Sequence, residues 1–292
     1  MHWLARTAPL GYNEDNAAKR MYLEFLGLRE KPFTVTSDPA FLYLSKKHRE
    51  ALSHMVYGIR ERKGFVEITG EIGTGKTTLC KALLRHLDAS TKTALLLHSA
   101  LSDLQLLQAV VKDFGLNPMR GDRLGLFNQL NQFLIEQASL GNNVVVVVDE
   151  AQNLSLRLLE QIRLLSNLET DKEKLIQIIL VGQPQLHEKL ASPALEQLRQ
   201  RIGVRYHITA LDRDEVYTYI EHRLRVAGSN GSLAWTADGV DEIFRLSKGI
   251  PRLINLLSDR ALLACYVFRI KQVDGEIVRR SFQELEGQVL TA

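Results

Sequence analysis

The sequence has only two cysteines, Cys80 and Cys265, and no apolar run long enough to cross a bilayer. A disulfide framework needs more cysteines in a short secreted chain, so we expect both thiols to be reduced and buried. The longest apolar runs, 144–148 and 261–267, fall far short of the roughly 20 residues of a membrane-spanning helix. Residues 1–20 lack the features of a signal peptide, so we expect a cytoplasmic protein without direct membrane insertion, peripheral at the inner membrane at most through partners.

Paired metal-ligand spacings and a strong excess of one charge are also absent. The two cysteines and eight histidines form no CxxC or HExxH pattern, which argues against a zinc site. The net charge of +3 does not by itself predict nucleic-acid binding. What the chain has is an ordinary globular composition, 45% hydrophobic and 24% charged, and 292 residues, enough for one large and one smaller domain.

Apolar runs and helical patterns alternate between residues 64 and 208, which is typical of a parallel sheet covered by helices. The expected strands are 65–69, 94–97, 144–148 and 176–181. The five valines of 144–148 predict a central strand, since a strand buried on both faces is apolar at every position. Beyond residue 209 we expect no further strands but four helices, at 213–227, 236–248, 251–268 and 274–285.

Residues 70–78 read GEIGTGKTT and match the P-loop pattern GxxxxGK[ST] between an expected strand and an expected helix. Glycines let backbone N–H groups wrap phosphates, and the helix N-terminus adds positive potential. Lys76 is predicted to contact the β- and γ-phosphates and Thr77 to bind Mg²⁺. We therefore expect ATP and Mg²⁺ as cofactors, held by Gly70, Glu71, Gly73, Thr74, Gly75, Lys76, Thr77 and Thr78.

Three further polar residues follow expected strands and should meet at the ligand-binding edge of the sheet. Asp149 and Glu150 come directly after the valine strand, in the Walker B position. We expect Asp149 to hold Mg²⁺ and Glu150 to orient and polarise the attacking water. Gln183 follows strand 176–181 and is the sensor-1 candidate, the alternative being a side chain that only fixes the turn before Pro184.

Three arginines are candidates for phosphate contacts. Arg199 and Arg201 end a helical stretch, and one of them would act as an arginine finger on a neighbouring subunit's nucleotide; solvated surface charge is the alternative. Arg252 opens helix 251–268 and is the sensor-2 candidate, the alternative being a surface charge. On this helix we expect one polar and one apolar face, with Arg252, Asn255 and Asp259 on the first and Leu253, Leu256 and Leu257 on the second.

With these motifs in place, the sequence from about Met21 onward resembles the bacterial AAA+ ATPases of the general secretion pathway protein A (ExeA) and MSHA biogenesis protein MshM family. The matching stretches are 21–33, 38–52, 70–79, 146–154, 180–186, 197–202 and 249–255. The resemblance implies an α/β fold, a P-loop NTPase (AAA+) with a three-layer α/β/α core, a parallel sheet and a small C-terminal α-helical lid domain. The expected domains are a flexible extension at 1–20, the nucleotide-binding domain at 21–208 and the lid at 209–292.

The resemblance also implies residue roles. Residues 41–45, with Tyr43, and His48 would lie beside the adenine, while Gln183, Arg201 and Arg252 would act as sensor 1, finger and sensor 2. The strand at 94–97 is followed by His98 and Ser99, where related ATPases often carry an Asn that restrains the catalytic Glu. We therefore expect no such switch here.

The leading hypothesis is an ATPase that binds and hydrolyses MgATP to drive or regulate assembly of a type II secretion or type IV pilus-like system. It would work as a homo-oligomer with shared ATP sites, alongside secretion or pilus assembly proteins. One alternative is an ATP-dependent DNA-binding regulator of the transposition (TnsC/TniB-like) type, because the expected helix over 46–63 has a basic face. Another is a nucleotide-dependent scaffold with slow turnover.

Overall fold

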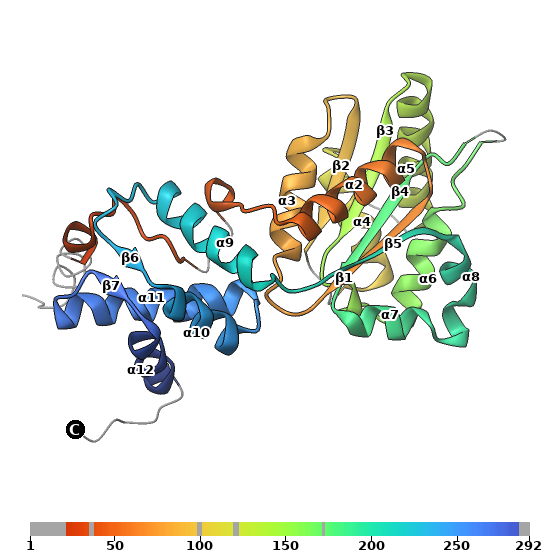
Figure 1. Ribbon diagram of the computed structural model, residues 1–292. Helices are drawn as coiled ribbons and strands as arrows, with labels where there is room; N and C mark the ends of the chain where they lie inside the picture. Colours follow the sequence, from red (N-terminus) through yellow and green to blue (C-terminus); the bar gives the residue numbers. More distant parts are fainter. Residues whose placement is uncertain (1–21, 35–37, 98–100, 119–122, 171–172, 286–292) are drawn as a thin grey trace, which may run out of the picture. The chain divides into compact units, whose positions relative to one another are not determined.

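The chain is described by a computed structural model that covers residues 22–34, 38–97, 101–118, 123–170 and 173–285. It divides into two compact units, Ser37–Ala210 and a unit formed by Met1–Thr36 with Leu211–Ala292 (Figure 1). The predicted extension at 1–20 lies outside the described residues, as do His98 and Ser99. No helix in the described parts of the chain is long and apolar enough to cross a membrane.

The unit Ser37–Ala210 contains a parallel five-stranded sheet in the order β2-β3-β4-β1-β5. Its strands are β1 (Phe65–Gly70), β2 (Thr91–Leu96), β3 (Asn143–Val148), β4 (Gln177–Gly182) and β5 (Ile202–Ile208). The four predicted strands are confirmed with small shifts at their ends. Strand β5 was not predicted, because it pairs only with β1 at the edge of the sheet and carries polar residues such as Arg205 and His207 between its buried positions.

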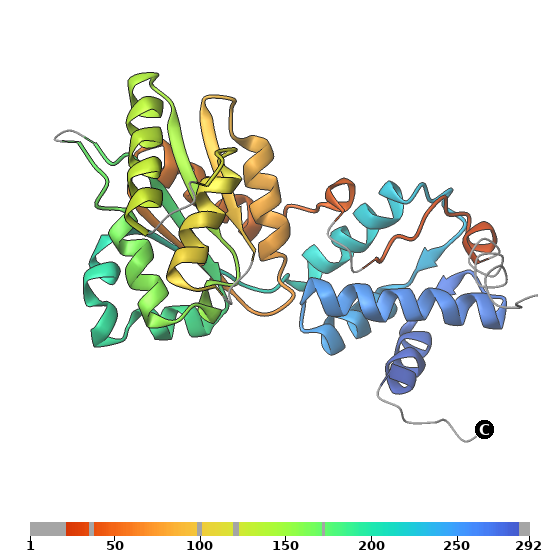
Figure 2. The same ribbon diagram turned by 180° about the vertical axis from the view of Figure 1, so that it is seen from behind.

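Helices cover both faces of this sheet (Figures 1 and 2). They are α2 (Lys46–Arg60), α3 (Lys76–His86), α4 (Asp103–Asp113), α5 (Arg123–Ser139), α6 (Leu156–Leu165), α7 (Pro184–Leu190) and α8 (Glu196–Arg201), with short 3₁₀ turns η1 (Pro39–Phe41), η2 (Ala151–Asn153) and η3 (Pro193–Leu195). The alternating valines of β3 enter two different apolar cores, Val146 with α4, α5 and α6, and Val147 with α2 and α3. A central strand within three layers is therefore confirmed.

The other unit holds the four helices predicted for the C-terminal part, and their bounds agree within two residues. They are α9 (Arg213–Val226), α10 (Ala237–Ser247), α11 (Pro251–Phe268) and α12 (Gly275–Leu285). Helix α10 is followed by Lys248 and Gly249, which both adopt left-handed backbone conformations and so end the helix. Pro251 lies in the first turn of α11. The expectation that strands stop at residue 209 was wrong, because β6 (Ala234–Trp235) and β7 (Gln272–Val273) form a parallel pair too short to leave a pattern.

The N-terminal boundary also differs from the predicted one. Residues 22–34 belong to the same compact unit as the C-terminal helices, whereas the predicted range 21–208 assigned them to the nucleotide-binding domain. Leu26 and Phe33 are buried there, and the Arg223 guanidinium of α9 donates to the carbonyl oxygens of Pro32 (2.5 Å) and Thr34 (3.3 Å). The two hydrogen bonds from Arg223 hold this segment to α9, and burial of the two apolar side chains adds to its place in this unit.

The predicted faces of α11 were wrong in part. Asn255 is buried, where its side-chain oxygen accepts a hydrogen bond from the Tyr219 hydroxyl (2.8 Å), whereas Leu253 and Leu256 are exposed. Leu257 is buried as expected. A polar residue with a buried partner can occupy a core position, which a pattern of apolar residues alone does not reveal.

Candidate functional site

Polar residues gather at one edge of the sheet, where strands β1, β3 and β4 end. Strand β4 lies between β1 and β3. Because the strands are parallel, the loop after β1, the Asp149–Glu150 pair after β3 and Gln183 after β4 all lie at this edge.

The loop from Gly70 to Gly75 has a backbone shape that requires glycine. Gly73 and Gly75 adopt φ angles of 83° and 93°, in the left-handed region that side chains disfavour. A Cβ at Gly70 would lie 2.9 Å from the carbonyl oxygen of Ile208. Helix α3 starts directly after this loop, and its N-cap Gly75 has no side chain to accept from the first-turn N–H groups. Phosphate oxygens are the acceptors that such a helix start favours.

Lys76 is 5% exposed, and its ammonium group lies inside the loop. Its Nζ donates to the carbonyl oxygens of Gly70 and Glu71, both at 2.9 Å. Burial lowers the pKa of Lys76, while the nearby charges of Glu150, Asp149 and Glu71 act in the opposite direction. The loop thus directs a cation toward the edge where the phosphates are predicted to bind.

Thr77 connects the start of α3 to the end of β3. Its hydroxyl donates to Oδ2 of Asp149 at 2.6 Å, and Oδ1 of Asp149 accepts from the backbone N–H of Glu150 at 2.9 Å. The described residues contain no group of three or more His, Cys, Asp or Glu that could hold a metal by themselves. Two adjacent oxygen donors suit Mg²⁺, which takes the rest of its ligands from water and substrate phosphates. Thr77 and Asp149 therefore fit the predicted ion.

Glu150 is held in an unusual conformation beside Asp149. Its φ of 52° is left-handed, which costs roughly 1–3 kcal/mol for a residue with a side chain. Oε2 of its carboxylate accepts from Nε2 of Gln152 at 2.6 Å and from Nε2 of Gln183 at 3.2 Å. The structure thus brings Glu150 and Gln183 together, and it adds Gln152, which sequence reasoning missed although it lies only two residues beyond Glu150.

His48 lies against the P-loop from the start of α2. Its Nε2 donates to the carbonyl oxygen of Thr74 at 2.7 Å, and its Nδ1 pairs with the Ser45 hydroxyl at 2.8 Å. A carbonyl can only accept, so Nε2 carries a proton. Tyr43 is partly buried in the segment before α2. Contact of His48 and Tyr43 with adenine stays a prediction.

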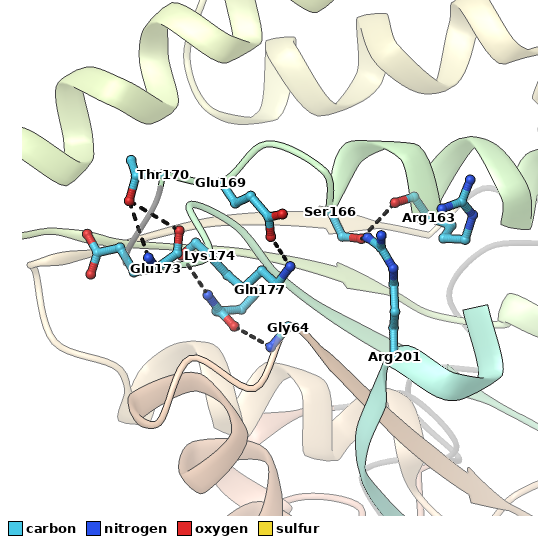
Figure 3. A network of polar contacts seen from close by, with 9 residues as sticks. All are labelled: Gly64, Arg163, Ser166, Glu169, Thr170, Glu173, Lys174, Gln177 and Arg201. Atoms are coloured by element: carbon cyan, nitrogen blue, oxygen red, sulfur yellow. Dashed lines mark hydrogen bonds and ion pairs between the residues drawn. The ribbon is translucent and has the colours of Figure 1, made fainter. Parts of the chain in front are cut away.

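The two finger candidates differ in exposure. Arg201 is partly buried at the end of α8, and it donates to the Ser166 hydroxyl at 2.8 Å, which in turn donates to the Arg163 carbonyl (Figure 3). Arg199 is exposed and lines a pocket of about 350 Å³ together with Glu67, His187 and Arg205. Arg252 is exposed in the first turn of α11, and its role at the γ-phosphate stays a prediction.

The fold and this edge define the class of the protein: it has the AAA-type P-loop NTPase fold, with a five-stranded parallel sheet and a helical C-terminal part. A family model described as an AAA domain matches residues 59–190. The Aeropyrum pernix ORC2 protein, solved in ADPNP-ADP complexes, is similar with a TM-score of 0.65 and 19% identity over 87% of this chain and 71% of that one. Cdc6p from Pyrobaculum aerophilum is similar with a TM-score of 0.62 and 17% identity over 84% of this chain and 70% of that one.

The particular resemblance expected from the sequence is also confirmed. The chain is 45% identical to general secretion pathway protein A of Aeromonas hydrophila over 247 residues, which make up 84% of this chain. It spans 45% of the length of that relative.

Proposed function

We propose that this chain binds MgATP at residues 70–78 and hydrolyses it, with Asp149 and Glu150 at the reacting end. The observation that carries the proposal is the 2.6 Å bond from Thr77 to Asp149, which joins the start of the P-loop helix to the end of β3. Glu150 follows at once, so the predicted Mg²⁺ ligands and the predicted base share one edge of the sheet.

Different residues bind the phosphates, activate the water and hold the metal ion in the proposed reaction. Lys76 exchanges its contacts with the Gly70 and Glu71 carbonyl groups for β- and γ-phosphate oxygens, and backbone N–H groups of the loop hold the rest of the phosphate chain. Glu150 accepts a proton from the water that attacks the γ-phosphorus, while the bond to the β-phosphate oxygen breaks. Thr77 and Asp149 would hold Mg²⁺, which would supply positive charge beside the phosphates.

The mechanism is tested by Glu150→Gln, which keeps the shape of the side chain and removes the base. We expect the kcat for ATP to fall about 10²–10³-fold, while the Kd for ATP stays within about threefold. Glu188→Gln, at an exposed carboxylate of α7, makes the same change in charge and should leave both values unchanged. Unchanged turnover in Glu150→Gln would reject this role of Glu150.

We further propose a homo-oligomer in which Arg199 or Arg201 completes the site of a neighbouring subunit. The exposure of Arg199 favours it as the finger, because Arg201 already has a partner in Ser166 of its own subunit. Specific activity should then rise with protein concentration, and Arg199→Ala should abolish that rise while nucleotide still binds. A specific activity that is constant across concentrations would contradict a shared site.

The process we propose is assembly of a type II secretion or type IV pilus-like system, supported by the similarity to general secretion pathway protein A. A protein that acts in this way should restore assembly in cells that lack it, and Lys76→Ala should fail to do so at equal expression. Restoration by Lys76→Ala would contradict a role of ATP in assembly and would count equally against the nucleotide-dependent scaffold.

A second candidate function is ATP-dependent DNA binding. It is favoured by the exposed basic residues Lys46, Arg49 and Arg60 on α2 and by fold relatives whose solved structures contain DNA. Double-stranded DNA should then raise turnover, and binding should weaken steeply as salt increases. No salt-dependent binding would remove this candidate.

A further inference from the structure

The carboxylate of Glu150 accepts a hydrogen bond from Gln152, whose side-chain amide has a partner at its nitrogen and another at its oxygen. Gln152 lies in the short turn η2 and is only 9% exposed. Its Nε2 donates to Oε2 of Glu150 at 2.6 Å, the shorter of the two amide contacts to that oxygen. At its other end, Oε1 accepts from the backbone N–H of Gln183 at 3.1 Å. One buried amide therefore bridges the ends of β3 and β4.

Surrounding residues make room for this bridge and hold it. A Cβ at Gly182 would lie 2.7 Å from Oε1 of Gln152, so glycine is required for the close approach. Nζ of Lys189 donates to the carbonyl oxygens of Gln152 (2.5 Å) and Leu154 (2.8 Å), which ties the same turn to α7. Both the backbone and the side chain of Gln152 are thus fixed.

We propose that Gln152 is a positioning residue that holds the Glu150 carboxylate for attack and links it to the start of α7; this rests on the proposed ATP hydrolysis. A short hydrogen bond to a carboxylate is charge-assisted and strongly directional. Because it engages Oε2, it leaves Oε1 as the acceptor for the attacking water. The bridge also lets the side chain of Gln183 turn from Glu150 to a phosphate without releasing the carboxylate.

Two substitutions of Gln152 distinguish its contact with Glu150 from its contact with Gln183. Gln152→Glu keeps an oxygen that accepts from the Gln183 N–H and replaces the donor to Glu150 with a second carboxylate. Gln152→Met keeps the side-chain length and removes both contacts. Lys189→Met is the matched control, because it loosens the same turn without removing a contact to Glu150.

We expect single-turnover hydrolysis to slow about 10–100-fold in Gln152→Met and in Gln152→Glu. The Kd for a fluorescent ATP analogue with Mg²⁺ should change less than about threefold. Lys189→Met keeps both side-chain contacts of Gln152 and should therefore slow hydrolysis much less than either substitution of Gln152. In a Glu150→Gln background, Gln152→Met should cause no further loss, since residues that act through one group are not additive.

Several results would overturn the inference. One is a normal rate in Gln152→Met while Glu150→Gln is inactive, which would leave the proposed function standing. Another is an equal loss in Lys189→Met, which would reduce Gln152 to support of the turn. A further loss of the same size in the Glu150→Gln background would show that Gln152 acts independently. No turnover above that of Lys76→Ala in the unmodified protein would overturn the proposed function and this inference together.

Discussion

Replacing His48 by leucine should weaken the binding of nucleotides through a change in the P-loop. His48 is 5% exposed, and its Nε2 supplies a hydrogen bond to the carbonyl oxygen of Thr74. Leucine has a similar volume but no donor, so this carbonyl loses its partner. The loop can recover a partner by turning the carbonyl toward water, which changes the backbone that cradles the phosphates.

The size of the effect follows from the cost of a buried acceptor that loses its donor, about 1–3 kcal/mol. In the unbound variant the loop can rearrange to avoid part of this cost, and ATP binding must then restore the original loop. If restoring it takes about 1–2 kcal/mol, the Kd for ATP rises roughly 5- to 30-fold. Glutamine at position 48 can place its Nε2 near that of histidine and should keep most of the affinity.

The assay measures the Kd of ATP, GTP and inorganic triphosphate for the unmodified protein, His48→Leu and His48→Gln. A loss that acts through the loop raises the Kd of all three ligands by a similar factor. Ser102→Ala is the control, since it removes the N-cap of α4 at a cost of about 1 kcal/mol without touching the P-loop. It should lower stability and leave all three Kd values unchanged.

A loss confined to ATP would refute this reasoning and would support the predicted contact of His48 with adenine. An unchanged affinity for all three ligands would show that the hydrogen bond to Thr74 has no influence on the loop.

Two further predictions concern stability and reactivity. Arg205→Met should lower the free energy of unfolding in urea by about 2–3 kcal/mol, because Glu67 is 2% exposed and Arg205 and His187 are its partners. Breaking a fully buried ion pair costs about 3–5 kcal/mol, and the loss here is smaller because Arg205 is 43% exposed and His187 remains. Adding Glu67→Gln should restore most of the loss, and no recovery would contradict this explanation. Burial raises the pKa of the Cys265 thiol from 9.0 to about 12, with Asp274 adding to the effect, and burial also raises the pKa of Cys80. Iodoacetamide at pH 9 should therefore modify the unfolded protein but not the folded one. Because the folded state keeps thiol protons that the unfolded state releases, the thiols' contribution to stability should be constant below about pH 9 and fall as pH rises toward 12, which thermal unfolding between pH 8 and pH 11 would measure.

Sequence patterns predicted the elements whose signal is local. The valine run of β3 and the glycines of the P-loop each constrain their own backbone, and both appear where expected. Strand β5 was missed because an edge strand needs few apolar residues, and the place of residues 22–34 was missed because their apolar side chains fit either unit. The buried Asn255 shows the same limit, since its partner is on a different helix.

The sequence by itself determined the parallel sheet, the P-loop and the carboxylate pair, because each depends on residues that are neighbours along the chain. The tertiary structure decided which side chains meet at the sheet edge. The Thr77–Asp149 and Gln183–Glu150 bonds join residues separated by 72 and 33 positions. The order of the strands in the sheet decides which strand ends lie close together in space. A hydrogen bond of about 3 Å further requires a particular backbone position and rotamer for each residue. A residue type predicts what a side chain can donate or accept, while packing selects its partner.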